Sequence, residues 1–438
     1  MSSRKKFIYQ LGLTTAGALL APTLKAFCYD DDPWFVRESL QKEMYAKAID
    51  IAKQKIRGGP TDPVFKKPFV DAAFSSNIFL WDTCFIACYA KYHPTELPIE
   101  NALDNFYNLQ DTDGFICREY TKEGGPMWPK DHPVSINPPL LAFAELELYS
   151  RSGNTKRLRH CYPALKKFYD FLVKHYRMDD QLFFSDALGS GMDNIPRYPD
   201  GWKDDGKGIT VNNLYPEIFR YDDTDSRWNK QGRAVDLSAQ MALFAEQLST
   251  IAGLINKKKD IAAYKQLYNE TRSAINQYCW NEADGFYYDL GYGKQIRRKH
   301  IGMFWVLMAG IVPKDKLGKV LAHLTDPKQF WRKFPVATYP ADQTEFSPAG
   351  NYWLGSVWAP TNYMVIKGLL RYDQKKLATL LAKQYYWSVA EVFKKTKTFW
   401  ENYAPDSIAQ GNPARPDFCG WTGIVPITLY HEFIQGGK

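Results

Sequence analysis

The sequence has no long apolar run, no cysteine framework and no basic cluster, and each absence excludes a class of protein. No segment reaches the ~18 consecutive apolar residues of a membrane span, so we expect none. The seven cysteines are odd in number and scattered, without a CxxC pair or a nearby histidine, which disfavours both a disulfide scaffold and a metal site. The net charge of +8 falls to +4 without the four basic residues of the first 26, and the remaining basic residues are interspersed with acids. Nucleic acid is therefore not an expected partner.

The first 26 residues have the pattern of an export signal. A basic stretch, MSSRKKF, precedes a short and weakly apolar core, LGLTTAGALLAP, and a cleavage site follows LKA at Ala26. SRKKF resembles the twin-arginine signal, although Lys5 stands where the second arginine belongs. The pattern predicts a periplasmic or secreted protein, by a Tat-like or Sec route, with a mature chain over 27–438. Cys28 lies near the cut, but the bulky Phe27 makes a poor lipoprotein box.

Aromatic residues are abundant at 15%, with 13 Trp, 28 Tyr and 26 Phe. Two interpretations are open. Aromatic rings fill large cores, and they also stack on the C–H faces of sugar rings in carbohydrate-binding cavities. Enrichment alone does not decide between them.

Helical periodicity dominates the chain after the signal. Twelve segments carry apolar residues at helical spacing, often in close pairs, and strand-like alternation is limited to pieces such as 284–290. Consecutive helical hairpins predict an all-α (α/α)6 toroid, with an irregular all-α domain as the alternative. No linker divides the chain, so we expect one domain. The segments are 38–56, 80–92, 98–109, 138–152, 155–176, 234–255, 260–280, 300–311, 313–324, 359–372, 373–395 and 422–435.

Four long loops are rich in aromatic residues, proline and glycine. Loops longer than ~12–15 residues are usually functional or disordered. In a toroid, the loops at one end of the inner helices form the rim of the central pocket, so we predict that all four lie on one rim. They are 117–139, 185–233, 334–360 and 399–421.

Four carboxylates in or beside these loops are candidates for catalysis. Glycoside hydrolysis uses two carboxyl groups, one protonated and one ionised, and packing against aromatic rings raises a carboxyl pKa. Each candidate also has a purely structural interpretation. The loop GSGMDNIPR places Asp193 where it is either a turn residue or an acid catalyst. The other three are Asp82 (LWDTC) as a buried acceptor of backbone N–H groups, Asp236 (AVDLSAQ) as a helix N-cap, and Glu401 (FWENYAP) as a surface partner of Trp400.

The blocks SGMDNIPR, YWLGSVWAPTNYMVIKGL and WENYAPDS…GWTGIVPITLY resemble the motifs of glycoside hydrolase family 63 and its bacterial relatives. This group includes α-glucosidases and mannosylglycerate hydrolases and is related to the trehalases. IFLWDTCFIA and INPPLLAFAELELY match two further blocks in the expected order, so the resemblance runs from about residue 70 to 435. The length matches the compact bacterial type. The resemblance implies an (α/α)6 barrel and an inverting mechanism that needs no metal or other cofactor.

The resemblance assigns roles to residues of these blocks. It implies that Asp193 is the general acid and Glu401 the general base. Leu354 and Ser356 stand where the family commonly has Arg and Pro, which affects the glycone preference, and the tryptophan that precedes the acid in trehalases is absent. The predicted substrate-binding residues are Trp81, Asp82, Asn137, Asn194, Arg197, Asp236, Trp353, Gly355 and Trp358, to which we add the loop tryptophans Trp128, Trp400 and Trp421.

Together these features predict an inverting, exo-acting α-glycosidase, specifically an α-glucosidase acting on an oligosaccharide. One alternative is a mannosylglycerate- or glucosylglycerate-type hydrolase, which would need cationic contacts such as Lys130, Arg197 or Arg220. A second is a non-catalytic sugar-binding toroid, which would need neither Asp193 nor Glu401. A small carbohydrate is the expected partner, and the sequence does not specify an oligomeric state.

Overall fold

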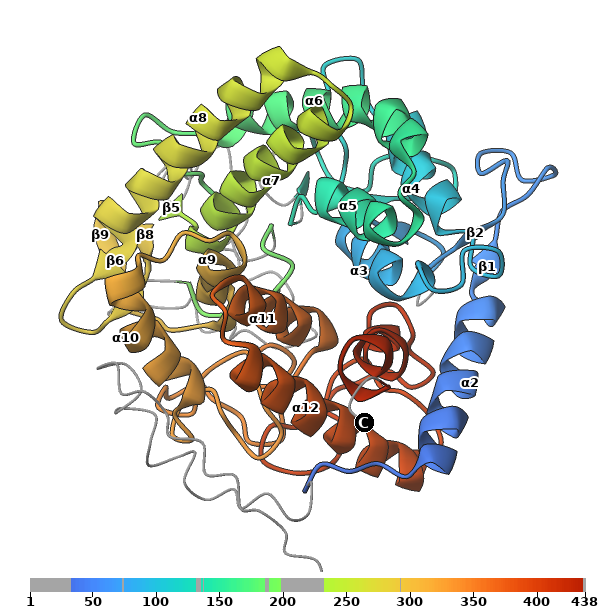
Figure 1. The fold of residues 1–438 in the computed structure, drawn as a ribbon, viewed down its shortest axis with the longest axis vertical. Helices are drawn as coiled ribbons and strands as arrows, with labels where there is room; N and C mark the ends of the chain where they lie inside the picture. Colours follow the sequence, from blue (N-terminus) through green and yellow to red (C-terminus); the bar gives the residue numbers. More distant parts are fainter. Residues whose placement is uncertain are drawn as a thin grey trace, which may run out of the picture.

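The fold is a ring of paired helices, seen along its axis in Figure 1. The computed structural model describes residues 33–72, 75–130, 135–136, 138–185, 189–197, 232–291 and 293–435. The predicted export signal, 1–26, lies outside these residues. Within them, outer and inner helices alternate along the chain, which confirms the predicted (α/α)6 toroid. The outer helices are α2 (Glu38–Gln54), α4 (Ile99–Asn108), α6 (Thr155–Tyr176), α8 (Lys258–Ala274), α10 (Lys314–Thr325) and α12 (Lys375–Thr396).

The inner helices differ from the outer ones in how much of their circumference is buried. All 11 residues of α3 are buried, whereas the 17 residues of α8 bury only Tyr264, Thr271 and Ala274. A helix enclosed by neighbours is apolar all round, and a helix that faces solvent needs only one apolar stripe. The inner helices are α3 (Leu80–Ala90), α5 (Leu141–Ser152), α7 (Val235–Leu254), η4 with α9 (Ile301–Phe304 and Trp305–Met308), α11 (Ala359–Arg371) and the π-helix η6 (Val425–Ile434).

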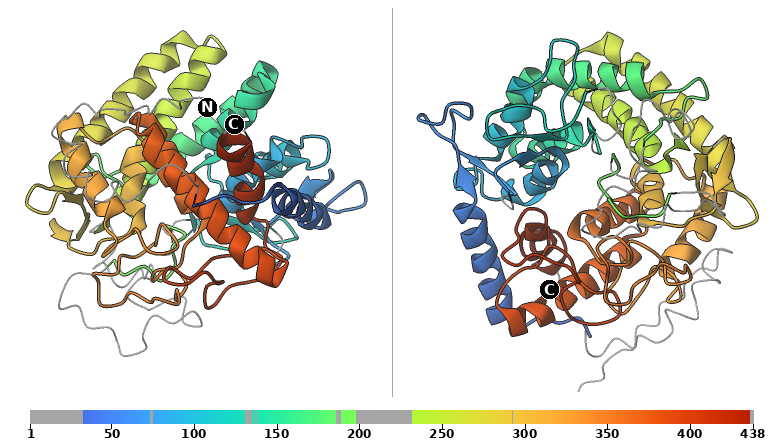
Figure 2. Two further views of the ribbon diagram at one scale, coloured as in Figure 1. Left: turned by 60° about the horizontal axis from the view of Figure 1, so that its bottom comes forward. Right: turned by 180° about the vertical axis from the view of Figure 1, so that it is seen from behind.

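The two ends of the described chain close the ring. Helix α2 packs on α12 and η6, so the first outer helix is paired with the last inner one (Figure 1 and Figure 2). The hydroxyl of Tyr45 on α2 lies 2.7 Å from His93 Nε2 and 2.9 Å from His431 Nε2 on η6. Closure therefore depends on contacts between residues almost 400 positions apart.

The segments between the helices contain short strands of two or three residues. The predicted strand at 284–290 appears as β7 (Phe286–Tyr287) and β8 (Asp289–Gly291). Strand β8 lies between β5 (Gly232–Arg233) and β9 (Lys294–Ile296), and β6 (Trp280–Asn281) pairs with β7. Two antiparallel pairs complete the set: β1 (Ile56–Arg57) with β2 (Phe69–Val70), and β3 (Ile78–Phe79) with β4 (Glu119–Tyr120), between which α3 and α4 lie in the sequence.

A buried ionic cluster joins four inner helices. Lys91 directly follows α3, and its Nζ lies 2.6 Å from Glu147 Oε2 on α5 and 3.3 Å from Glu432 Oε1 on η6. On α11, Lys367 Nζ lies 3.0 Å from the other Glu147 oxygen, and the Tyr363 hydroxyl donates to Glu432 at 3.1 Å. Alternating charges offset the cost of desolvating each one. The cluster thus links these helices without leaving a charge alone.

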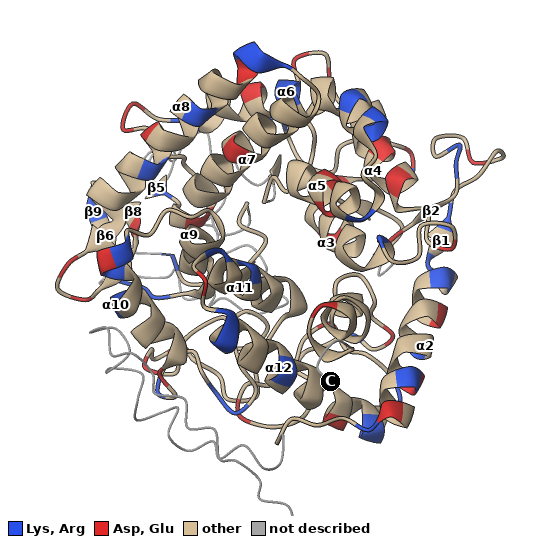
Figure 3. Ribbon diagram, in the orientation of Figure 1, with Lys and Arg blue, Asp and Glu red and all other residues tan. Residues whose placement is uncertain are grey.

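The remaining charged residues are dispersed. Figure 3 shows basic and acidic residues interspersed along the outer helices. No helix among the described residues combines the length and apolar character needed to cross a bilayer.

Candidate active site

The predicted site residues lie where the inner helices begin. Trp81 and Asp82 are the second and third residues of α3, and Asp236 is the second residue of α7. Trp358 directly precedes α11, and Trp421 directly precedes the short 3-10 helix η5 (Thr422–Ile424) that leads into η6. The positive ends of several helix dipoles therefore point toward one region, which favours negative charge there.

The loop that carries Asp193 is a tight turn packed against α3. Gly191 has φ +75°, and a Cβ atom on it would lie 2.9 Å from Cζ2 of Trp81, so glycine is required both by conformation and by space. Ser190 Oγ accepts the backbone N–H of Met192 at 3.0 Å. The side chain that caps this turn is thus Ser190, and Asp193 is left for another role.

Asn194 links the loop that carries Asp193 to the 334–360 loop. It is fully buried, its Oδ1 accepts the backbone N–H of Trp353 at 2.8 Å, and its Nδ2 donates to Asn351 O at 3.0 Å. Because both ends of the amide bind backbone atoms, Asn194 fixes the position of the neighbouring Asp193.

The Asp193 carboxyl is poised to hold a proton near neutral pH. Its side chain is 17% exposed, and its Oδ1 has no hydrogen-bond partner among the described residues. Burial raises the pKa of Asp193 to about 6; Arg118 opposes the rise and Glu119 adds to it. Arg118 Nη2 lies 3.9 Å from Asp193 Oδ1.

Glu401 is buried beside the same region. Its side chain is inside the protein, its backbone N–H donates to Arg415 O at 2.9 Å, and its carbonyl accepts the indole N–H of Trp421 at 3.0 Å. The interpretation of Glu401 as a surface partner of Trp400 is therefore wrong. Burial raises the pKa of Glu401 to about 7; Arg415 opposes the rise, and the charge of Asp193 adds to it. The two carboxyl groups thus influence each other's ionisation.

Four tryptophans form one cluster next to these carboxyls. Trp353 and Trp358 stack with ring centroids 4.0 Å apart and an interplanar angle of 3°. Trp421 meets Trp358 edge-on at 5.5 Å and Trp81 at 5.6 Å, and all four rings are buried. Within the described residues, Trp353 Nε1 and Asp82 Oδ1 are buried without a hydrogen-bond partner. Unpaired polar atoms of this kind are costly unless a ligand or water satisfies them.

Asp82 is the third carboxyl of the region. Burial raises its pKa well above the ordinary value, and the charges of Glu401 and Asp71 raise it further. Backbone groups do not satisfy both of its oxygens, because Oδ1 is unpaired in the described structure. The neighbouring aromatic wall and this free oxygen together suit the binding of a sugar hydroxyl.

Tyr352 is a member of the site that the sequence analysis missed. It has φ +58°, in the left-handed region, and its ring meets Trp358 edge-on at 5.1 Å. Burial raises the pKa of its hydroxyl well above the ordinary value, and so do the charges of Asp193, Glu401 and Asp82. The charges of all three carboxyls therefore act on this hydroxyl. Its position beside Trp353 in YWLGSVW was the available signal, but no sequence pattern predicted its backbone conformation.

Arg197 ends the acid loop in a buried charge network. Its Nη1 lies 3.1 Å from Asp236 Oδ1 and 3.1 Å from Asp289 Oδ2. Asp289 Oδ1 accepts the backbone N–H of Val235 at 2.8 Å, and His300 Nε2 lies 3.1 Å from Asp289 Oδ2. Although burial acts in the opposite direction, Arg197 and His300 lower the pKa of Asp289 to about 2. This network anchors the acid loop to the start of α7.

The network also corrects the sequence analysis. The N-cap residue of α7 is Ala234, so the interpretation of Asp236 as an N-cap is wrong. Asp289 and His300 were not predicted. Asp289 lies in the segment recognised only as a strand, and its partner Arg197 is 92 residues away.

The remaining predicted residues have other contacts or lie outside the described residues. Trp128 is half-buried and its indole N–H donates to Glu119 Oε2 at 2.9 Å, whereas Trp400 donates to Thr396 Oγ1 at 3.2 Å. Gly355 has φ +132°, and a Cβ atom there would lie 2.9 Å from the ring of Phe346. Asn137 and Arg220 lie outside the described residues.

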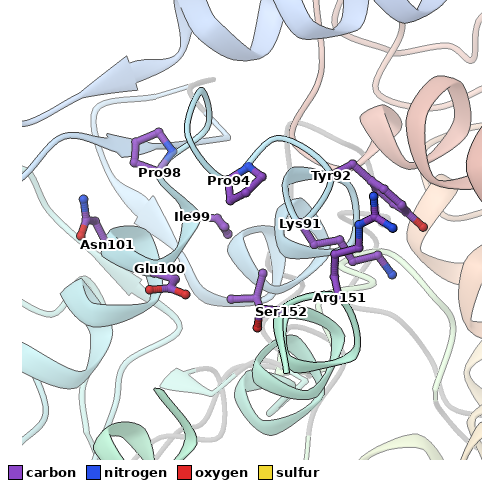
Figure 4. A pocket seen from close by; sticks show the side chains of 10 residues that line it. Lys91, Tyr92, Pro94, Pro98, Ile99, Glu100, Asn101, Arg151 and Ser152 are labelled. Atoms are coloured by element: carbon purple, nitrogen blue, oxygen red, sulfur yellow. The ribbon is translucent and has the colours of Figure 1, made fainter. Parts of the chain in front are cut away.

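A cavity of about 500 Å³ lies away from this site (Figure 4). It is bounded by the residues that end α3 and α5 and by the first turn of α4, and none of the predicted site residues lines it. Lys91, Tyr92 and Arg151 are among its lining residues. Within the described chain, no group of three or more His, Cys, Asp or Glu side chains is arranged to hold a metal ion.

The architecture and the site define a class: an (α/α)6 toroid with a buried carboxyl pair and a tryptophan cluster where its inner helices begin. Comparison with known proteins defines the family. Residues 75–422 match the mannosylglycerate hydrolase MGH1-like glycoside hydrolase domain, and the chain belongs to this family. The resemblance noted in the sequence is thereby confirmed.

Individual relatives are distant. The chain is 24% identical over 415 residues to a mannosyl-oligosaccharide glucosidase of Saccharomyces cerevisiae, covering 79% of this chain and 49% of that protein. It is 24% identical over 335 residues to a periplasmic trehalase of Salmonella newport, covering 67% and 56%. It therefore spans about half of the length of these curated relatives. The GH63 mannosylglycerate hydrolase of Thermus thermophilus, solved with glucose, shares the fold with a TM-score of 0.68 at 20% identity, covering 88% of this chain and 99% of that one.

Proposed function

We propose that the protein is an inverting, exo-acting α-glycosidase in which Asp193 is the general acid and Glu401 the general base. The observation that carries the proposal is the pair itself: two buried carboxyls with raised pKa values beside a tryptophan cluster that holds unpaired polar atoms. A sugar-binding toroid would need no such pair. Family membership supports the same reaction class.

In the proposed reaction the two carboxyls have complementary roles. Asp193 donates its proton to the glycosidic oxygen as the bond from that oxygen to the anomeric carbon breaks. Glu401 removes a proton from a water molecule on the opposite face of the sugar ring, and the water oxygen bonds to the anomeric carbon. This inverting geometry needs the two carboxyls roughly 6.5–9.5 Å apart. Asp82 and the Trp353 indole N–H are placed to bind sugar hydroxyls, with Trp81 and Trp358 as apolar walls.

The proton must sit on Asp193 when the reaction begins. Burial raises the pKa of Asp193 to about 6 and that of Glu401 to about 7, and the charge of Asp193 adds to the rise at Glu401, so the pair tends to hold a single proton near neutral pH. A hydrogen bond from the attacking water to the ionised Glu401 favours the arrangement with that proton on Asp193.

For the substrate, we propose an α-linked glucoside. One curated relative is a glucosidase and one structural neighbour was solved with glucose, while the tryptophan that precedes the acid in trehalases is Met192 here. A glycoside with an anionic leaving group is the second candidate, because the guanidinium groups of Arg118 and Arg415 influence the two catalytic carboxyls. Lys130 does not support this candidate, since Asp111 and Asp113 already pair with it at 2.9 and 2.5 Å.

The anomeric form of the first product tests the proposal. We expect proton NMR of a fresh reaction to show the β-anomer before mutarotation, because the water attacks from the face opposite the α-linked leaving group. The substrates are α-linked gluco- and manno-disaccharides and the corresponding glycosyl-glycerates. Comparing the hydrolysis of the two kinds of substrate also distinguishes the glucoside from the glycoside with an anionic leaving group. An α-anomer formed first would mean retention and would overturn the role of Glu401 as a base.

We also propose that the protein is exported. The basic and apolar pattern of residues 1–26 supports export, as does the similarity to a periplasmic trehalase. N-terminal sequencing of protein from the native host is expected to begin near Phe27. Recovery of residues 1–26 on the functional protein would contradict this.

A further inference from the structure

We propose that Arg118 is a positioning residue for the acid step: it holds the Asp193 carboxyl in place and stabilises the carboxylate that remains after the proton has moved to the leaving group. This inference rests on the proposed role of Asp193 as general acid. Neither the motif blocks nor the tryptophan pattern of the sequence pointed to Arg118.

The two side chains form an ion pair without a hydrogen bond between them. Arg118 Nη2 lies 3.9 Å from Asp193 Oδ1, and the two side chains are 11% and 17% exposed. At this distance in a largely buried setting, a cation stabilises the ionised carboxylate by substantially more than it would in water. The protonated acid gains little from the same cation, so the interaction strengthens as the proton leaves.

The guanidinium is held by a rigid support. Its Cζ lies 5.8 Å from the ring centroid of Trp128, a cation–π arrangement. The Trp128 indole N–H donates to Glu119 Oε2 at 2.9 Å, and Asn77 Nδ2 donates to the other Glu119 oxygen at 2.6 Å. Trp128, a predicted substrate-binding residue, thus also supports the Arg118 guanidinium.

The backbone around Arg118 is equally constrained. Its N–H donates to Ser135 O at 2.7 Å, and its carbonyl accepts the N–H of Leu80, the first residue of α3, at 2.9 Å. The next residue, Glu119, pairs with Phe79 in the antiparallel β3–β4 pair. Arg118 is thus hydrogen-bonded to the N-terminus of α3, which carries Trp81 and Asp82, whereas Asp193 lies on a separate loop.

Several charged groups face Asp193 and must be considered together. Arg118, which directly precedes β4, opposes the rise in its pKa, and Glu119, the first residue of β4, supports that rise. Glu401 on the 399–421 loop and the Tyr352 hydroxyl on the 334–360 loop also interact with its charge. Arg118 is the one cation among these four groups. Removing it leaves burial and negative charge to raise the pKa of Asp193 further.

The test is a direct titration of Asp193, independent of turnover. Carbon-13 NMR of Asp-labelled protein identifies the Asp193 carboxyl as the signal lost in Asp193→Asn. In Arg118→Met we expect its midpoint to move up by about 1–3 pH units, the usual effect of an opposite charge within contact distance. Arg118→Lys keeps the charge and is expected to retain most of the wild-type midpoint. Arg151→Met, at an exposed arginine beside the remote cavity, is the matched control and should leave the midpoint unchanged.

Kinetics supply the second readout. If Arg118 stabilises the product carboxylate, then at a pH below both midpoints, where Asp193 is protonated in either protein, Arg118→Met should lower kcat about 10- to 100-fold for substrates with basic leaving groups and much less for activated aryl glycosides. An unchanged midpoint in a folded Arg118→Met protein, as judged by circular dichroism, would overturn the inference. If the Asp193 midpoint shifts in Arg118→Met but the wild-type protein has no glycosidase activity, the electrostatic interaction between Arg118 and Asp193 stands and the proposed function is refuted.

Discussion

Glu401→Gln is expected to lower kcat by about 10²–10⁴-fold for every substrate that the wild-type protein hydrolyses. Glutamine matches the shape of glutamate but cannot accept the proton of the attacking water. Activation of the water is needed whatever the leaving group, so activated aryl glycosides should be affected as strongly as disaccharides. Steady-state kinetics on both substrate types measures this.

Asp193→Asn is expected to give a loss of the same order that depends on the leaving group. Asparagine cannot donate a proton to the glycosidic oxygen, so basic leaving groups such as sugars should suffer the full effect. An activated aryl group leaves without protonation, so its hydrolysis should be largely spared. The ratio between the two substrate types therefore separates the acid from the base.

The control for both variants is Glu123→Gln, a matched amide substitution at a side chain that is 68% exposed in the same loop as Trp128. It should retain wild-type kinetics. Thermal unfolding should show that all three variants are folded. Near-normal turnover in either Glu401→Gln or Asp193→Asn would mean that a different pair performs the reaction, or that the toroid binds sugars without cleaving them.

Arg197→Met is expected to be the most destabilising single substitution near the site, at about 3–5 kcal/mol. It removes the cation between Asp236 and Asp289, and both carboxylates are buried. The cost of burying an unpaired charge is large because no water replaces the lost partner. Urea unfolding measures the change. Activity should fall as well, since Arg197 ends the loop that positions Asp193.

Two comparisons make this prediction specific. Arg197→Lys keeps the charge but not the forked donors, so a smaller loss is expected. Arg297→Met breaks an exposed pair with Asp284, the arginine being 53% exposed, and should cost less than about 1 kcal/mol. A loss below about 1 kcal/mol in Arg197→Met would show that the network is not an anchor.

Because the pKa of Asp289 is lowered to about 2, the wild-type network should stabilise the fold above about pH 4 and lose that contribution as the pH falls toward 2.

Local patterns determined the helices and part of the site. The 3.6-residue spacing of apolar side chains marked all twelve helical segments, because each helix must bury a face against its neighbours. The motif blocks marked Asp193, Glu401 and the buried tryptophans, since those residues stand in short contiguous stretches. Gly191 was visible as part of a turn, but its contact with Trp81 was not.

Only the tertiary structure decided which residues face one another. Arg197 meets Asp236 and Asp289 across 39 and 92 residues, and Arg118 meets Asp193 from a separate loop far away in the sequence. No local pattern encodes such a pairing, because it depends on how the ring closes and on where each loop crosses it. The same holds for the pKa values of Asp193 and Glu401. Both residue types are ordinary acids in sequence, and it is burial in the folded protein that raises their pKa values to about 6 and about 7.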